Sequence, residues 1–270
     1  MQLFYPHAPS AGPRTPIVSP QNAPLKYLRV EWLRLAPGEA PVEIATGPDE
    51  LALDILSGRC TARLSGACGP HAYEQIGGRR SVFDGPPTML YVPRDSTLQI
   101  SAASEGFEAL LIFAPARSAP PARLIGPEEC ILKTVGKDNW QRQVATSIGE
   151  NMAADRLIIG ETLNPPGNWS SAPPHKHDSY ENGEVPMEEV YIFRLDPPQG
   201  FGFQRVYAYG PNAFDCAFAV QDGDTVVLPR GYHPVVAGPG YRLAYIWALA
   251  GEARRYGAWS DDPKHAWIKD

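Results

Sequence analysis

Two histidines stand two residues apart in the segment Pro173–Asp178, and this spacing suits a metal site. A β-strand returns its side chains to one face at every second residue, so His175 and His177 would point the same way. A third histidine, His233, follows in the segment Leu228–Pro234. Imidazoles combined with one carboxylate suit a borderline divalent cation. The sequence therefore predicts a metal centre that takes part in a reaction.

The carboxylate ligand has three candidates. Glu189 begins the apolar segment 189–195, where a strand would hold the side chain rigidly, and it is the preferred choice. Glu188 comes second, and Glu181, in a polar loop, comes third. The other histidines lie in a proline-rich arm, beside a turn and in a charged tail, and we interpret them as structural or solvated: His7, His71 and His265.

Short apolar segments bounded by turns dominate the chain from residue 27 onward. Clear examples are 27–35, 51–56 and 109–113. The 29 prolines and 25 glycines suit a fold with many turns. This pattern predicts an all-β protein, either a sandwich or a barrel, with little helix. Only residues 140–148 have a weak helical pattern.

An internal repeat predicts two barrels. Residues 91–100 resemble residues 227–236, with a Val-Pro-Arg core in one and a Leu-Pro-Arg core in the other. Thr97 stands where the second copy has His233, and the first copy lacks a His-x-His segment. The metal should therefore be confined to the C-terminal copy. The predicted units are an extended arm at 1–24, a barrel without metal ligands at 25–150, and a metal-binding barrel at 151–270.

Composition narrows the range of partners and compartments. A net charge of −6 and a pI near 5.6 argue against binding to nucleic acid or to an anionic membrane. No apolar stretch approaches the roughly 20 residues of a membrane helix. The N-terminal residues do not resemble a secretion signal, so we expect a cytoplasmic protein. The four cysteines show no C-x-x-C pair, which favours reduced thiols over a disulfide between Cys60 and Cys68.

Long motifs around these residues carry a resemblance to a known family. They include the segments 165–171, 173–178, 200–207 and 229–234. The chain resembles the 5-deoxy-glucuronate isomerases of bacterial myo-inositol catabolism, most densely from about residue 160 onward. The resemblance implies a two-barrel cupin fold and the isomerisation of 5-deoxy-D-glucuronate to 2-deoxy-5-keto-D-gluconate. A related isomerase of pectin breakdown places its metal glutamate directly before a Val-Tyr strand, which corresponds to Glu189 here.

The resemblance also implies a set of working residues. One divalent transition metal (Zn, Mn, Fe or Co) would polarise a carbonyl and its neighbouring hydroxyl, and a general base would move a proton. The candidates for acid–base work, which the sequence does not rank, are Glu188, Tyr191, Tyr207, Tyr232 and Lys176. The substrate is a small sugar acid, and the candidates for binding it are Arg205, Arg230 and Tyr191.

Two other functions fit the same fold. One is a different metal-dependent cupin enzyme, such as an iron-dependent oxygenase, and the other is a sugar-binding cupin without catalysis. Oxygen consumption would identify the first, and the presence of three histidines and a glutamate argues against the second. Exposed strand edges are compatible with a homo-oligomer.

Overall fold

A computed structural model describes residues 1–8 and 12–270 of the chain. Within this part the regular elements are strands and four short 3₁₀ turns, which confirms the all-β prediction. The helix suggested at 140–148 is wrong, because Arg142–Ile148 forms strand β13, paired on both sides. None of the four cysteines forms a disulfide. The described residues contain no helix with the length and apolar character needed to cross a bilayer.

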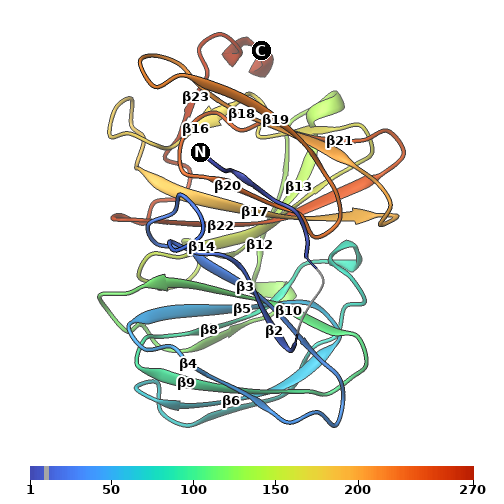
Figure 1. The fold of residues 1–270 in the computed structure, drawn as a ribbon, viewed down its shortest axis with the longest axis vertical. Coiled ribbons are helices and arrows are strands. Elements are labelled where there is room, and N and C mark those ends of the chain that lie inside the picture. Colours follow the sequence, from blue (N-terminus) through green and yellow to red (C-terminus); the bar gives the residue numbers. More distant parts are fainter. Residues whose placement is uncertain (9–11) are drawn as a thin grey trace.

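The strands form two stacked halves, each built from a large and a small sheet (Figure 1). In the N-terminal half the large sheet has the order β11-β8-β5-β10-β3-β2, and the small sheet has the order β4-β9-β6-β7. Their bounds are β2 Arg14–Val18, β3 Arg29–Leu35, β4 Val42–Ala45, β5 Asp49–Ser57, β6 Arg59–Gly66, β7 His71–Gly77, β8 Thr88–Val92, β9 Ser96–Ala102, β10 Phe107–Pro115 and β11 Arg123–Ile125.

In the C-terminal half the large sheet has the order β1-β20-β17-β22-β14-β13-β12, and the small sheet has the order β15-β21-β18-β19. A two-stranded ribbon joins β16 to β23. The bounds are β1 Phe4–Tyr5, β12 Ile131–Val135, β13 Arg142–Ile148, β14 Ile158–Asn164, β15 Trp169–Ser170, β16 His175–Lys176, β17 Met187–Asp196, β18 Gly202–Ala208, β19 Phe214–Val220, β20 Thr225–Leu228, β21 Val235–Ala237, β22 Arg242–Gly251 and β23 Ser260–Asp261.

The two halves repeat one topology. The order β8-β5-β10-β3-β2 matches β20-β17-β22-β14-β13, and the small sheets match strand for strand. In this register Leu51, opposite Val92, stands where Glu189 stands opposite Leu228. The interior of the N-terminal half is filled with aliphatic and aromatic side chains, Leu51 among them. The topology therefore supports the internal repeat, and it gives the first copy a leucine at the position of the predicted ligand Glu189.

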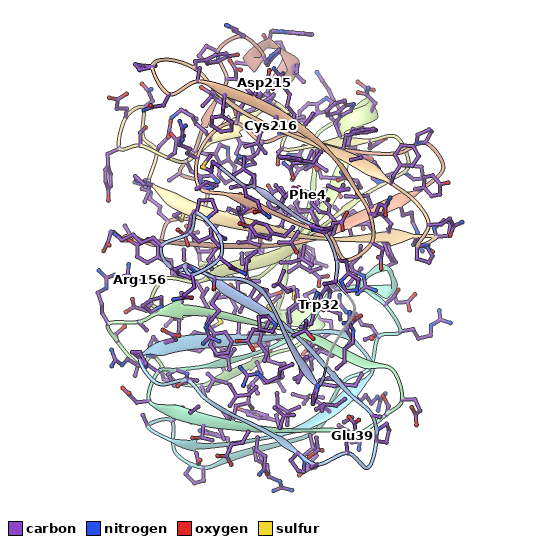
Figure 2. All side chains as sticks on the ribbon, viewed as in Figure 1. Phe4, Trp32, Glu39, Arg156, Asp215 and Cys216 are labelled. Carbon is purple, nitrogen blue, oxygen red and sulfur yellow. The ribbon has the colours of Figure 1, made fainter. Side chains whose placement is uncertain are left out.

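Strand pairing does not follow the predicted domain limits. Within residues 1–24, β1 pairs with β20 of the C-terminal half and β2 pairs with β3 of the N-terminal half, so this segment is paired rather than a separate arm. Figure 2 shows Phe4 in the upper half, where its ring stacks on Phe218. β12 and β13 precede residue 150 but belong to the C-terminal sheet. We propose that the halves divide between β11 and β12.

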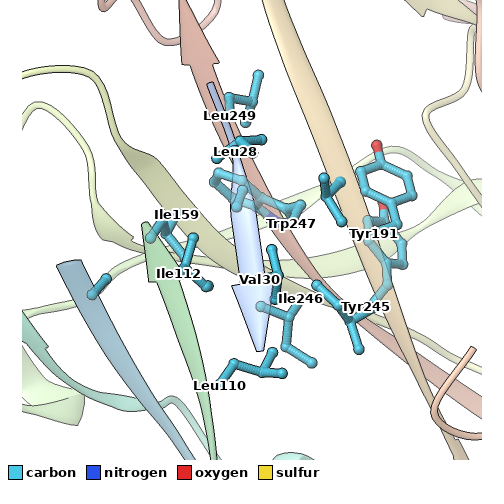
Figure 3. Packing of buried hydrophobic residues seen from close by; sticks show 14 of the residues in the cluster. Leu28, Val30, Leu110, Ile112, Ile159, Tyr191, Tyr245, Ile246, Trp247 and Leu249 are labelled. Atoms are coloured by element: carbon cyan, nitrogen blue, oxygen red, sulfur yellow. The ribbon is translucent and has the colours of Figure 1, made fainter. Parts of the chain in front are cut away.

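The large sheets of the two halves pack face to face. Val30 and Ile112 of the N-terminal half belong to the same buried cluster as Ile159 and Ile246 of the C-terminal half (Figure 3). Burial of apolar surface contributes a free energy of about 25 cal/mol per Å². The apolar contact between the two large sheets is therefore the main contribution that holds the halves together. Because side chains alternate along a strand, the opposite face of the C-terminal sheet is left to face its small sheet. That inner face is where a site can form.

A buried cluster of charged side chains also links the two halves. Arg79, from the loop after β7, donates two hydrogen bonds of 2.6 and 2.7 Å to the carboxylate of Glu161 on β14. Asp54 of β5 lies 3.7 Å from the same guanidinium and is fully buried. All three side chains are at most 8% exposed, so their charges interact in a poorly screened environment.

Candidate metal centre

Three of the four predicted ligands converge at the inner face of the C-terminal sheet. Glu189 projects from β17, His177 directly follows β16, and His233 lies between β20 and β21. Their ligand atoms all lie within 4.8 Å of one another, and all three side chains are buried. Residues separated by up to 56 positions in the sequence thus meet at one point.

Backbone carbonyls fix which nitrogen of each imidazole faces the centre. Nδ1 of His177 lies 2.8 Å from the carbonyl of Met187, and Nδ1 of His233 lies 2.8 Å from the carbonyl of Gly231. A carbonyl only accepts, so each Nδ1 carries the proton and each Nε2 presents a lone pair. The two Nε2 atoms lie 3.2 and 3.5 Å from Oε2 of Glu189.

This arrangement brings acceptors together and needs a positive charge between them. Among the described residues, Nε2 of His233 has no hydrogen-bond partner although it is fully buried. A buried polar atom without a partner is costly. A divalent cation bound by two nitrogens and one carboxylate oxygen would satisfy all three atoms, so the donor set fits the predicted metal.

In the absence of a cation, the pKa shifts of His233 and His177 reflect the same buried environment. Burial, the largest influence, lowers the pKa of His233 to about 4, so its imidazole is neutral. Burial, the largest influence, opposes protonation of His177, but without a cation the carboxylate of Glu189 beside Nε2 raises its pKa overall, so a bound metal would displace a proton there. A neutral imidazole is the form that binds a metal.

His175 lies beside these three residues rather than among them. Its ring centre is 4.8 Å from that of His233, and the ring stacks on Trp259 at 5.0 Å. Burial, followed by the neighbouring histidines, holds its pKa well below the ordinary value. The role of His175 as a fourth ligand stays a prediction.

The centre opens into a cavity of about 220 Å³. At about 30 Å³ per water molecule, this is room for roughly seven waters, which suits a small polar metabolite. Tyr191, a predicted substrate-binding residue, lines the cavity, and its hydroxyl lies 3.1 Å from Oγ of Ser171. The remaining lining residues include several that were not predicted, namely Lys133, Val135, Arg142, Val144, Thr162, Ser171, Tyr245, Trp247, Leu249, Tyr256 and Trp259.

Two predicted acid–base candidates point away from the cavity. Glu188 is adjacent to Glu189 and therefore projects from the other face of β17, where its carboxylate accepts three backbone N–H bonds from residues 26–28. Lys176 lies between the two histidines and forms ion pairs with Asp178 and Glu184. The strand alternation that aligns the ligands excludes both neighbours from the site, which corrects their predicted roles.

Two of the three tyrosines predicted as acid–base candidates, Tyr207 and Tyr232, lie outside the cavity as well. Tyr232 precedes the inward-facing His233, and its ring packs on Tyr207, 5.2 Å away between centres. The hydroxyl of Tyr207 donates to Asp262 at 2.6 Å, beneath the C-terminal segment. The carboxylate of Asp262 also accepts from Tyr209. Neither tyrosine lines the cavity, so their predicted catalytic roles are corrected too.

The two predicted arginines are surface groups. Arg205 is paired with Asp215 on the exposed face of β18, and Arg230 donates to the carbonyl of Asn212. The neighbour of Arg205, Gln204, points inward and donates to the carbonyl of His233 at 2.8 Å, so it positions this ligand. Side chains alternate along a strand, so a surface Arg205 implies that its neighbour Gln204 faces inward. This alternation could have identified Gln204 from the sequence.

Two positively charged side chains of the cavity come from residues that the sequence assigned to the N-terminal barrel. Arg142 on β13 and Lys133 on β12 both line it, although these two residues precede His175 by 33 and 42 positions. Strand pairing aligns Lys133 with Val144, and Arg142 lies two residues from Val144 on the same face. Only tertiary pairing brings these residues to the site, because their local sequence carries no motif.

The structural role of Glu188 leads to a prediction. Glu188→Ala removes the acceptor of three backbone N–H groups, and we expect unfolding free energy to fall by about 2–4 kcal/mol. Metal content and activity per folded molecule should be retained, whereas Glu189→Ala should lose both. Urea titration, metal analysis and an activity assay on both variants check this. A Glu188→Ala protein that is stable but inactive would restore Glu188 as a catalytic candidate.

The fold is of the cupin type, and its inner face presents two histidines and a glutamate that could hold a metal ion. The chain belongs to the KduI/IolB family, whose sequence model matches residues 4–268. It is 36% identical to a 5-deoxy-glucuronate isomerase of Geobacillus kaustophilus and 34% identical to one of Geobacillus thermodenitrificans, each alignment covering 98% of this chain and 94% of the relative. The resemblance noted from the motifs is thereby confirmed.

Solved structures place the fold in the same group. An IolB-like protein from Salmonella typhimurium LT2 superposes with a TM-score of 0.92 at 31% identity, with both chains fully covered. An oxalate decarboxylase of Lactobacillus farciminis, in complex with formate, superposes with a TM-score of 0.63 at 14% identity, covering 96% of this chain and 91% of its own. The second likeness concerns the fold alone.

Proposed function

We propose that this protein is a metal-dependent aldose–ketose isomerase that converts 5-deoxy-D-glucuronate to 2-deoxy-5-keto-D-gluconate in myo-inositol catabolism. The observation that carries the proposal is the convergence of the two Nε2 atoms on Oε2 of Glu189 at the wall of a small cavity. The activity named for relatives at 34–36% identity supplies the substrate.

In this proposal His177, His233 and Glu189 hold one divalent ion (Zn, Mn, Fe or Co), and His175 is a fourth ligand. Such an ion, when bound, polarises a carbonyl and the adjacent hydroxyl of the substrate, which favours transfer of a proton between the two carbons. The atoms balance within the substrate, because the proton that leaves the hydroxyl-bearing carbon is matched by one added to the former aldehyde carbon, and the proton lost by that hydroxyl is matched by one gained by the former aldehyde oxygen.

Residues of the chain itself prepare the cavity for this reaction. Burial, the largest influence, holds the pKa of Tyr191 well above its ordinary value, so Oη keeps its proton and can donate to a substrate oxygen. Buried aromatic side chains such as Trp247 and Tyr245 form part of the wall. A wall of low polarity strengthens the charge interactions inside the cavity.

A direct assay tests the proposal. Purified protein incubated with 5-deoxy-D-glucuronate should yield the ketone product by NMR, with no oxygen consumed in the same tube. Removal of metal by a chelator should stop the reaction, and one equivalent of divalent ion should restore it. Consumption of oxygen would favour the oxygenase alternative, and full activity of protein freed of metal would overturn the mechanism.

A further inference from the structure

We propose that Arg142 binds the carboxylate of the substrate and makes this cavity selective for sugar acids over neutral sugars. The guanidinium lines the same cavity as Glu189, His175 and His177, and it reaches the carbonyl of Ala172, just before the metal-binding segment. The identity of the sugar in this inference rests on the proposed function. The preference for an acid rests on the charge and position of Arg142.

Arg142 has no acidic partner within the part of the chain that the structure describes. Its hydrogen bonds go to the carbonyls of Trp140 at 3.2 Å and Ala172 at 3.4 Å, both from Nη1. A guanidinium has five N–H donors, so most of its donors are left for a ligand. Burial lowers the pKa of Arg142, yet an arginine keeps its charge in proteins.

Several other arginines withdrawn from solvent have carboxylate partners. Arg79 is paired with Glu161, and Arg194 is paired with Glu108 and Asp222. Arg254 has no ion pair, but it donates to backbone carbonyls through both Nε and Nη2. The hydrogen bonds of Arg142 come from Nη1 alone, and since removing a cation from water without a counter-charge is unfavourable, its other donors favour an anion in the cavity. A carboxylate fits best, because its two oxygens match the planar fork of a guanidinium.

The position of Arg142 also suits the reaction. The candidate metal ligands and the guanidinium of Arg142 line one cavity, so a ligand with a carboxylate at one end and a carbonyl–hydroxyl pair at the other can engage both at once. The cations predicted from sequence, Arg205, Arg230 and Lys176, do not line this cavity.

The experiment compares two ligands that differ only in charge. Calorimetric titration of metal-loaded protein would use 5-deoxy-D-glucuronate and the neutral sugar in which the carboxylate is replaced by CH₂OH. The wild type should bind the acid about 10- to 100-fold more tightly, the range expected for a charge-assisted pair. Arg142→Gln should lose this preference while it binds the neutral sugar as before, and Arg142→Lys should keep part of it.

Controls separate this inference from the proposed activity. Arg205→Gln removes a similar charge from the exposed face of β18 and should leave the preference unchanged, and metal content and thermal midpoint should be the same in all variants. If Arg142→Gln keeps the preference, or the wild type shows none, the inference is overturned. If the wild type prefers the acid through Arg142 but does not isomerise it, the inference stands and the proposed function fails.

Discussion

His177→Ala is expected to lose bound metal and to lower turnover by at least ~10³-fold, since a bound cation contributes several kcal/mol to transition-state stabilisation. The Nε2 atom of His177 lies 3.2 Å from Oε2 of Glu189, at the centre of the buried trio. Elemental analysis should fall from near one ion per chain to a small fraction. Far-UV circular dichroism and urea titration would confirm that the variant remains folded.

Matched variants make this test specific. His71→Ala removes an exposed histidine of the β6–β7 hairpin and should change neither metal content nor activity. Glu189→Gln should behave like His177→Ala, whereas Glu181→Gln, on an exposed loop residue, should behave like the wild type. Loss of metal in Glu181→Gln but not in Glu189→Gln would show that the ligand assignment is wrong.

Arg79→Met is expected to give the largest loss of stability, about 3–5 kcal/mol, without touching the metal centre. The variant would leave Glu161 and Asp54 as buried carboxylates without a cation, at the interface between the halves. It would also leave the carbonyls of Ile55 and Gly85 without their donor. Urea unfolding followed by tryptophan fluorescence measures the effect. The adjacent Arg80 is 90% exposed, and Arg80→Met is the control that should change little.

The pH dependence gives a second check on this cluster. Burial, and then the charge of Glu161, raise the pKa of Asp54 well above its ordinary value. A carboxyl with a higher pKa in the folded state holds its proton more tightly there than in the unfolded chain, so its contribution to stability declines as pH rises above about 4. The penalty of Arg79→Met should therefore grow with pH, and Asp54→Asn should flatten the profile. An equal penalty at pH 5 and pH 8 would contradict this.

Strand alternation explains which of the predicted site residues the structure brings together. The i, i+2 spacing of His175 and His177 and the position of Glu189 near the start of β17 are local features that the sequence carries. Lys176, Glu188 and Tyr232, three of the acid–base candidates, each stand next to a predicted ligand in the sequence. In a strand, adjacency places a side chain on the opposite face, so the reasoning that selected the ligands should also have excluded their neighbours.

Local periodicity and long motifs were enough to predict the all-β class, the internal repeat and three residues that converge in the candidate metal centre. Tertiary structure alone decided that β12 and β13 complete the C-terminal sheet and bring Arg142 and Lys133 into the cavity. It also decided that residues 1–24 pair with both halves. The physical reason is that the packing of the whole sheet decides which strands form hydrogen bonds with each other. The sequence of one short strand does not specify its neighbour.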